Sequence, residues 1–470
     1  MSAWIATHGT LPRVIPELYS GFGYFYPPLF HIVGAAWIRA FGTDAFRYLN
    51  VFVTALLLTW VAFGVRRAGA PQSGDATGRT AAREAARWAV LLCVANSWLA
   101  HHAMRLYVEQ LTALLAVGAV LLTLELRRTP RMRTAVVLGA VAGLAVVAKL
   151  SMLALPGMLF ALAGSYAVRR ERNVAGAFAV AGGIALLVAA PLFIRNALLF
   201  GSPIYPALAP DRNALLYELN RAGFTPAPMA FYRATAAHTG LAIRLMVLAG
   251  FVMSLVRRRG SLEVGLLASC VVVTLGAPLQ AMLDPRHLLP IIAVAAVLGP
   301  LVVARHLVAL PRNRWTSGAR IGITAVLLVL AAQSLVPMNN QRKSLDLSAP
   351  LAEAFEAVRE NVPAGETVLS LWTYDTWFYS GRPATWPIPW SQQDPPVEMF
   401  LTADCDSVML ALDRHHLRYL LVPRQAGAAR FTGLNYPREF LLCVGELIGQ
   451  QRLEVLWSSP TLGLVKVAGP

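Results

Sequence analysis

Four charged residues lie within or beside long apolar stretches, where a charge is costly and by default marks a site. They are Glu109 in HHAMRLYVEQ, Lys149 in AVVAKLSML, Arg195 in APLFIRNALLF and Arg286 in MLDPRHLLP. A carboxylate could serve as a general base or a metal ligand, whereas Lys and Arg bind phosphate groups. If the helix ends that carry them meet, the three cations predict a receptor for an anionic group, most simply a lipid phosphate or pyrophosphate.

Each of these residues also has a purely structural explanation. Arg105 precedes Glu109 by four residues, a spacing that places both on one helix face as an ion pair. Lys149 could extend to the lipid headgroups, and Arg195 and Arg286 could anchor helix ends at the interface. The hypothesis of a shared site therefore depends on whether these positions converge in space.

The composition indicates what kind of scaffold must position them. Of the 470 residues, 56% are hydrophobic and only 14% are charged, and the mean hydropathy is +0.54. Soluble domains have about 45–50% apolar and about 25% charged residues. Apolar runs long enough to cross a bilayer, about 17–25 residues, recur between residues 45 and 337. The sequence thus predicts an α-helical multi-pass membrane protein.

The net charge of +16 belongs to this membrane part. Residues 1–337 contain 30 Lys and Arg against 11 Asp and Glu, whereas residues 338–470 contain 11 against 14. Of the 41 basic residues, 19 are arginines in five short segments between apolar runs, as the positive-inside rule expects of cytoplasmic loops. These segments are 66–87, 127–133, 169–172, 257–259 and 305–320. The basic charge is therefore a topology signal, and we expect no nucleic-acid partner.

About ten transmembrane helices fit this pattern. They are predicted over 45–64, 88–103, 107–126, 134–149, 150–168, 174–198, 240–256, 261–281, 287–309 and 320–337. Alternation then places the loop 199–239 and everything after residue 337 outside. The apolar segment 28–41 contains Arg39 and is short for a span, so we expect a re-entrant or interfacial helix. Either it spans after all, or, as we favour, a first transmembrane helix is lacking before it.

Residues 338–470 predict a small extracytoplasmic α/β domain. Helical spacing covers 350–361, and Asp404 can cap a helix that continues to about residue 416. Strands are expected over 367–371 and 419–422, with a closing hairpin over 453–457 and 462–467. The aromatic and proline-rich stretch 372–396 is too irregular for an element. Cys405 and Cys443 could form a disulfide or remain free thiols. The predicted domains are thus 1–44, 45–337 and 338–470.

Four segments resemble, in order, the GT-C glycosyltransferases related to family 39 and the protein mannosyltransferases. FGYFYPPLFHIVGAAWIRAFG resembles the first outer loop with its membrane-parallel helix, and GAVAGLAVVAKLSML resembles a Gly-rich helix ending in Lys. APLFIRNALLFGSPIYP and DPRHLLPIIA are similar to two further motifs of the family. The resemblance covers residues 20–340.

The resemblance implies inverting transfer of a sugar from a polyprenyl-phosphate donor to a glycan, lipid or protein acceptor, on the outer face of the bacterial cytoplasmic membrane. Lys149, Arg195 and Arg286 would bind the donor phosphate. Glu109 lies where relatives have a second-loop acid, and Glu17 is the available first-loop carboxylate for the general base. Glu17 is closer to the Tyr-Pro-Pro segment than the family's Asp, which is a departure from the pattern.

Further contacts to the acceptor or the sugar are predicted for Arg105, Tyr26, Tyr107 and His287. No cofactor is required by the sequence and no metal site is predicted, although a divalent cation stays open as a cofactor because Glu109 lies near two histidines.

Two other classes compete with a transferase. A secondary transporter or flippase of lipid-linked or soluble sugars would also be multi-pass, but it usually shows two matched halves with polar residues at the midplane. A non-catalytic membrane subunit that binds glycan is the other alternative, favoured by the displaced first-loop acid.

The topology is directly testable. A cysteine introduced at Tyr24 should react with a membrane-impermeant thiol reagent from the outside, since the first loop is predicted to be extracytoplasmic. Labelling of that cysteine only from the cytoplasmic side would contradict an outer first loop.

Overall fold

The computed structural model describes most of the chain. The described residues are 2–9, 27–42, 44–69, 76–104, 107–205, 228–256, 262–276, 285–308, 310, 314–343, 349–385, 404–424 and 438–468.

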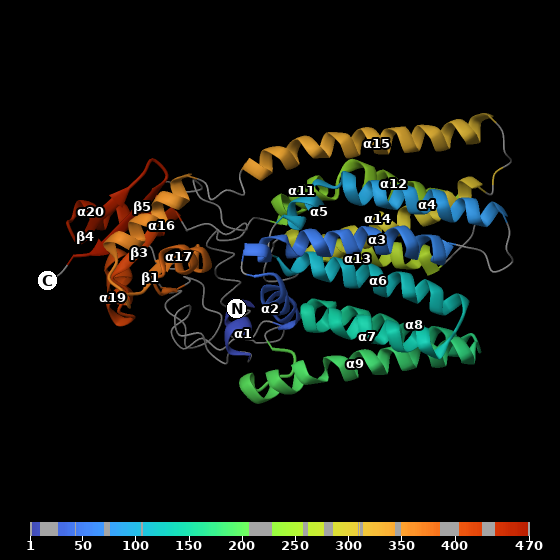
Figure 1. The fold of residues 1–470 in the computed structure, drawn as a ribbon, viewed down its shortest axis with the longest axis horizontal. Coiled ribbons are helices and arrows are strands. Elements are labelled where there is room, and N and C mark those ends of the chain that lie inside the picture. Colours follow the sequence, from blue (N-terminus) through green and yellow to red (C-terminus); the bar gives the residue numbers. More distant parts are fainter. Residues whose placement is uncertain are drawn as a thin grey trace.

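A bundle of long helices makes up most of the molecule (Figure 1). Its members are α3 (Leu49–Gly69), α4 (Ala76–Ala95), α6 (Val108–Arg128), α7 (Met132–Ala148), α8 (Ala154–Val168), α9 (Arg172–Phe200), α12 (Leu241–Val256), α13 (Leu262–Gly276), α14 (Leu289–Val308) and α15 (Arg314–Lys343). Shorter elements lie between or before them: α1 (Ser2–His8), α2 (Leu29–Phe41), η1 (Asp44–Tyr48), α5 (Ser97–Ala103), η2 (Leu150–Leu153), α11 (Pro228–Thr239) and η4 (Pro285–Leu288).

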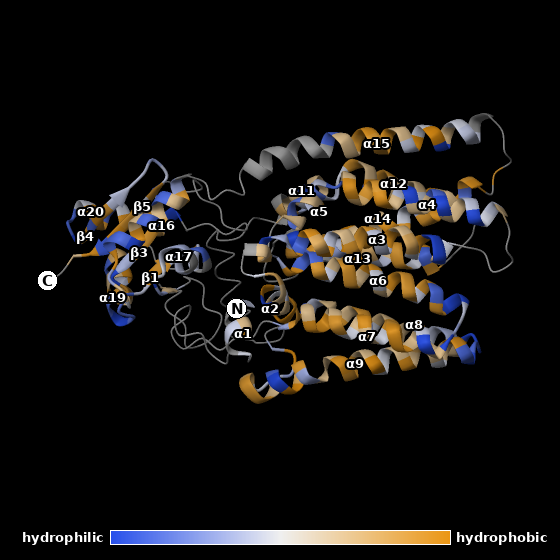
Figure 2. Ribbon diagram, viewed as in Figure 1, coloured by the Kyte–Doolittle hydropathy of each residue, from blue (hydrophilic) through white to orange (hydrophobic). Residues whose placement is uncertain are grey.

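Each of the ten predicted spans overlaps one of these helices. By length and apolar composition, six described helices can cross a membrane, or seven if the pair 231–239 and 241–256, bent by 85°, is one span. Helices 132–148 and 262–274 are apolar but shorter. The chain is a multi-pass membrane protein, and the middle of the bundle is mostly hydrophobic while hydrophilic segments lie at helix ends (Figure 2).

The prediction of one continuous span over 88–103 is wrong. Helix α4 ends at Ala95, and Asn96 caps the separate helix α5 by accepting a hydrogen bond from the Leu99 amide. The Asn96 side chain also donates to the carbonyl oxygens of His238 and Thr239, at 2.9 and 3.0 Å. This polar break therefore ties α5 to α11.

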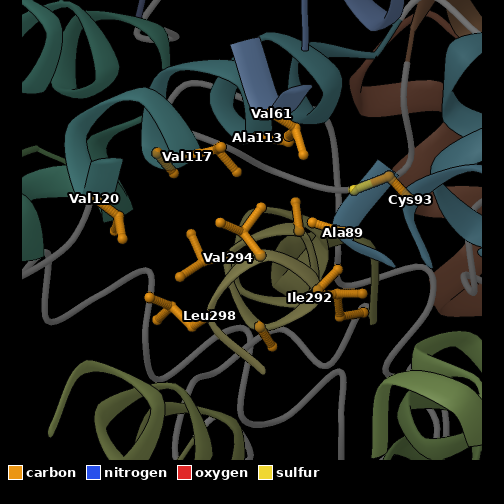
Figure 3. Close-up of a cluster of buried hydrophobic side chains, with 14 of the residues drawn as sticks. Val61, Ala89, Cys93, Ala113, Val117, Val120, Ile292, Val294 and Leu298 are labelled. Carbon is orange, nitrogen blue, oxygen red and sulfur yellow. The ribbon is translucent and has the colours of Figure 1, made fainter. Parts of the chain in front are cut away.

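Helix α14 forms the centre of the bundle. Its apolar window is 89% buried, as expected for a helix that is hydrophobic on every side. Figure 3 shows α14 nearly end-on, with Val294 on the side of Val117 of α6 and Ile292 on the side of Ala89 and Cys93 of α4. The central helix of the core, α14, thus comes late in the sequence.

The N-terminal segment lies at one end of this bundle. The predicted short helix over 28–41 is present as α2, which packs on α1 and η1 and runs across the bundle direction (Figure 1).

A five-stranded sheet organises the C-terminal unit, with the order β2-β1-β3-β5-β4. Its strands are β1 (Val368–Ser370), β2 (Ala384–Thr385), β3 (Tyr419–Pro423), β4 (Leu453–Ser458) and β5 (Leu462–Val467). Strand β1 is parallel to β2 and β3, whereas β5 is antiparallel to β3 and β4. The helices of this unit are α16 (Ala349–Asn361), α17 (Thr373–Ser380), α19 (Cys405–Arg414) and α20 (Arg438–Gly449).

This unit confirms the predicted α/β class. Asp404 caps α19 by accepting hydrogen bonds from the amides of Asp406 and Ser407. The prediction that 372–396 contains no element is wrong, because α17 and β2 lie within 373–385. The Thr373 and Ser380 hydroxyl groups donate hydrogen bonds to carbonyl oxygens earlier in the chain. Gly381 ends the helix with a φ of 68°. Cys405 and Cys443 are free thiols.

Two helices of the bundle approach very closely at glycines. A Cβ atom added at Gly139 would lie 2.5 Å from the carbonyl oxygen of Ala181, and one at Gly143 would lie 2.6 Å from that of Ala185. The spacing of four places both glycines on one face of α7, toward α9. Small residues at this spacing allow membrane helices to pack backbone against backbone.

Gly143→Ala should therefore destabilise the protein by about 1–3 kcal/mol, because the added methyl group must push α7 from α9. The measurement is thermal unfolding in detergent. Gly157→Ala on α8 is the matched control, since a Cβ there meets no atom within 4 Å. A loss of stability in the control equal to that of Gly143→Ala would contradict the close approach.

Candidate active site

A buried carboxylate lies at the N-terminal end of α6. Glu109 is the second residue of that helix, where the helix dipole favours a negative charge, and the residue is 3% exposed. The Lys149 ammonium donates a hydrogen bond to Glu109 Oε1 at 3.0 Å. The Arg286 Nε lies 3.8 Å from the same oxygen. One carboxylate is thus held by two cations.

These three charges come from distant segments of the chain. Lys149 follows the last residue of α7 in an extended backbone conformation, before the 3-10 turn η2. Arg286 lies in η4, directly before α14. Both side chains reach the start of α6 from positions just outside a long helix, Lys149 after α7 and Arg286 before α14. We call Glu109, Lys149 and Arg286 the ion cluster.

Aromatic and histidine side chains surround the ion cluster. The Arg286 guanidinium lies 5.2 Å from the centre of the Tyr107 ring, in a cation–π contact. His102 lies beside Tyr107, with ring centres 5.6 Å apart, and is buried. His287 follows Arg286 and is partly buried. Tyr107 and His287, both predicted to contact substrate, therefore adjoin the charged groups.

An asparagine fixes this turn to the neighbouring helix. The Asn50 side chain, at the start of α3, donates to the carbonyl oxygen of Tyr107 at 2.8 Å and to that of His102 at 3.4 Å. Sequence reasoning missed Asn50, which is fully buried, although an amide residue at the start of an apolar run was an available signal. The backbone at His102 and at Tyr107 is thereby held against α3.

A stack of rings extends from the same region. Trp98 of α5 stacks on His238 of α11 with ring centres 3.6 Å apart, and on His101 at 5.5 Å. His102 donates a hydrogen bond through Nδ1 to the Trp98 carbonyl oxygen, at 3.0 Å. Helix α11 also packs on η4, which carries Arg286. The rings thus connect the break at Asn96 to the ion cluster.

The comparison with solved structures shows which fold this is. The crystal structure of ArnT from Cupriavidus metallidurans bound to undecaprenyl phosphate matches with a TM-score of 0.57 at 13% identity, over 100% of this chain and 93% of ArnT. The Archaeoglobus fulgidus oligosaccharyltransferase complexed with zinc and sulfate matches with a TM-score of 0.57 at 15% identity, over 90% of this chain. Both neighbours belong to the GT-C superfamily. The chain has the GT-C fold.

The chain spans 62% of the length of the archaeal oligosaccharyltransferase. No family model matches the chain, and no curated protein matches it significantly. The GT-C fold is thus recognised in the arrangement of helices at low sequence identity, in agreement with the resemblance of the four sequence segments.

Within this GT-C fold, Arg195 is placed differently from the other two predicted cations. It lies near the end of α9, donates to the Asn196 side chain at 3.2 Å and lies 5.9 Å from the centre of the Phe200 ring. Asn196 in turn donates to the carbonyl oxygen of Tyr205 at 3.1 Å. These two contacts of Arg195 lie at the end of α9. Its role toward a phosphate stays a prediction.

Other predicted residues are not placed. Glu17, Tyr26 and Arg105 lie outside the described residues. Among the residues that are described, no group of three or more His, Cys, Asp or Glu side chains is arranged to hold a metal ion. The described partners of Glu109 are cations, and they disfavour a divalent cation beside it.

Removal of the central charge has a predictable cost. Glu109→Gln leaves two largely buried cations facing each other, with side chains 14% and 19% exposed, and should destabilise the protein by about 3 kcal/mol. Thermal unfolding in detergent measures this. The control is Glu125→Gln on the same helix, whose partner Arg67 is 71% exposed, so its loss should cost less than about 1 kcal/mol. Equal losses in both variants would contradict the buried ion cluster.

Proposed function

We propose that the protein is a membrane glycosyltransferase that moves a sugar from a polyprenyl-phosphate donor to an acceptor at the end of the bundle that carries the ion cluster. The observation that carries this proposal is the pairing of Lys149 and Arg286 around one buried carboxylate within a GT-C fold. The presence of undecaprenyl phosphate in the ArnT structure supports a polyprenyl-phosphate donor.

The charge balance of the ion cluster suits an anionic donor. Two cations face one carboxylate, which leaves one net positive charge at a largely buried position. Arg286 can offer further N–H donors to phosphate oxygens, and Lys149 contributes a point charge. Both would neutralise the charge that develops on the leaving phosphate when the bond between the sugar and the phosphate oxygen breaks.

Glu109 is best assigned as a positioning residue rather than as the base. A general base must reach the proton of the acceptor hydroxyl, but Glu109 is 3% exposed and its Oε1 is directed at Lys149 and Arg286. Its contacts hold the two cations in place for the donor phosphate. Glu17 remains the proposed base that accepts the proton of the acceptor in an inverting displacement.

The distribution of arginines supports an extracytoplasmic site. Arg127 and Arg128 end α6 at the side opposite to Glu109, and Arg305 lies in the last turn of α14. If these arginines are cytoplasmic, as the positive-inside rule expects, the ion cluster and the adjoining C-terminal unit face outward. We propose this orientation in the bacterial cytoplasmic membrane, with the domains 1–44, 45–337 and 338–470 as predicted from the sequence.

The decisive experiment is a transfer assay. Vesicles that contain the protein are supplied with a radiolabelled polyprenyl-phosphate sugar, and the release of polyprenyl phosphate and the labelling of endogenous glycan, lipid and protein are followed. Uptake of a soluble sugar without any transfer would contradict the proposal and favour a transporter.

Arg286→Gln should lower the transfer rate by about 10²–10³-fold, because the variant loses a charged donor at the leaving phosphate. Lys149→Gln should act in the same direction. Arg244→Gln is the matched control, since Arg244 is an exposed arginine at the start of α12 with a bond to the Gly240 carbonyl. Transfer that is unchanged in both cluster variants, with the proteins folded, would contradict the proposed phosphate contacts.

A further inference from the structure

A second set of charges, built around one buried carboxylate, lies at the other end of the bundle. Glu263, in the first turn of α13, is 3% exposed. Arg305 of α14 donates to its Oε1 at 2.8 Å, and Arg128 of α6 lies 4.0 Å from the same oxygen. From Glu109 to Arg128, α6 rises roughly 28 Å at 1.5 Å per residue. This set is therefore separate from the ion cluster.

A cavity of about 370 Å³ adjoins these charges and is partly open to the surface. Arg127, Arg128, Arg305 and Glu263 line it, so its wall carries three positive charges and one negative charge. The other residues that line it are small or apolar, among them Gly78 and Ala82 of α4. We call this the arginine pocket.

We infer that the arginine pocket binds a phosphate-bearing anion, and that this anion is the headgroup phosphate of an acidic phospholipid in the leaflet opposite the ion cluster. This inference does not rest on the proposed sugar transfer.

The charge balance calls for an anion. One carboxylate oxygen is shared by two guanidinium groups, and a third arginine adds to their mutual repulsion. A guanidinium has five N–H donors in a planar fork that fits phosphate oxygens, and the contact of Arg305 with Glu263 uses only part of this capacity. A phosphate in the cavity would reduce the net charge of two and accept the remaining donors.

The position of the pocket favours a lipid over a soluble phosphate. Arg128 ends α6 and Arg305 lies in the last turn of α14, and both helices are long and apolar enough to span a membrane. The last turn of a spanning helix lies at the depth of the headgroups. Basic pockets between helices at this depth bind the headgroups of acidic lipids.

The test compares lipids on the purified protein. Native mass spectrometry from detergent micelles doped with phosphatidylglycerol or with zwitterionic phosphatidylethanolamine counts the retained lipid. We expect preferential retention of phosphatidylglycerol, weakened about tenfold by Arg305→Gln or Arg128→Gln, as for one lost charge-assisted hydrogen bond. Arg305→Lys keeps the positive charge, so this variant should retain more phosphatidylglycerol than Arg305→Gln does. That difference would show that the weakened retention does not come from a folding defect.

Two further variants make the result specific. Arg133→Gln removes an exposed arginine at the same end of the bundle, outside the pocket, and should retain lipid as the unaltered protein does. Glu263→Gln removes the competing carboxylate, so retention should stay equal or increase. Equal retention of both lipids, or equal weakening by Arg133→Gln and Arg305→Gln, would overturn the inference.

A final arm separates the two sources of phosphate. Inorganic phosphate at millimolar concentration should compete with retained phosphatidylglycerol if the headgroup phosphate is what the arginines bind. Stabilisation of the protein by inorganic phosphate, without any retention of phosphatidylglycerol, would support an anion site but overturn its assignment to a lipid.

Discussion

The buried carboxylate of Glu109 imposes a constraint that reaches far along the chain. A buried charge is tolerated only when opposite charges lie against it, and its partners come from residues 149 and 286. The start of α6, the end of α7 and the turn before α14 must therefore meet at one point. Since α14 is the central helix of the bundle, this meeting also sets the depth at which the core helix lies among its neighbours.

Helices α6 and α14 carry charged residues at or beside both of their ends. Helix α6 runs from Glu109 to Arg128, and α14 runs from the turn of Arg286 to Arg305, with apolar residues between. The bundle thus holds two separate polar regions joined by an apolar interior. One is the proposed donor site, and the other lies at the arginine-rich end. The spacing between them is fixed by helix length rather than by loops.

The sequence predicts much of this fold, for reasons that are visible in particular residues. Charges beside apolar runs singled out Glu109, Lys149 and Arg286, which the structure brings together. Arg195 has the same kind of position in the sequence, but the sequence does not show which helix ends are neighbours. Hydropathy averages over a span, so it missed the break at Asn96. In the C-terminal unit the sequence predicts α16, β1, α19, β3, β4 and β5, but not α17, β2 or α20. The Trp and Tyr residues of α17 belong to a helix whose hydroxyl contacts and terminating Gly381 are visible only in the structure.

The features that escaped prediction are those that depend on contacts between distant segments. Asn50 holds the turn at Tyr107 through bonds that cross more than 50 positions of sequence, with separations of 52 and 57. The approach of α7 to α9 at Gly139 depends on a carbonyl of another helix. The residue type shows that a small or polar side chain is required at such positions. The residue that it contacts is visible only in the structure.

The late position of α14 in the chain governs the order in which the protein can be made. Its partners α3, α4 and α6 enter the membrane before the loop and helices up to residue 285 have been synthesised, yet their apolar faces are covered by a helix that begins at Leu289. Until then these faces must stay against lipid, chaperones or the insertion machinery, because contacts of such long sequence separation form late. A chain whose synthesis stops before Leu289 therefore lacks the central helix of its core, even if all the preceding helices have formed.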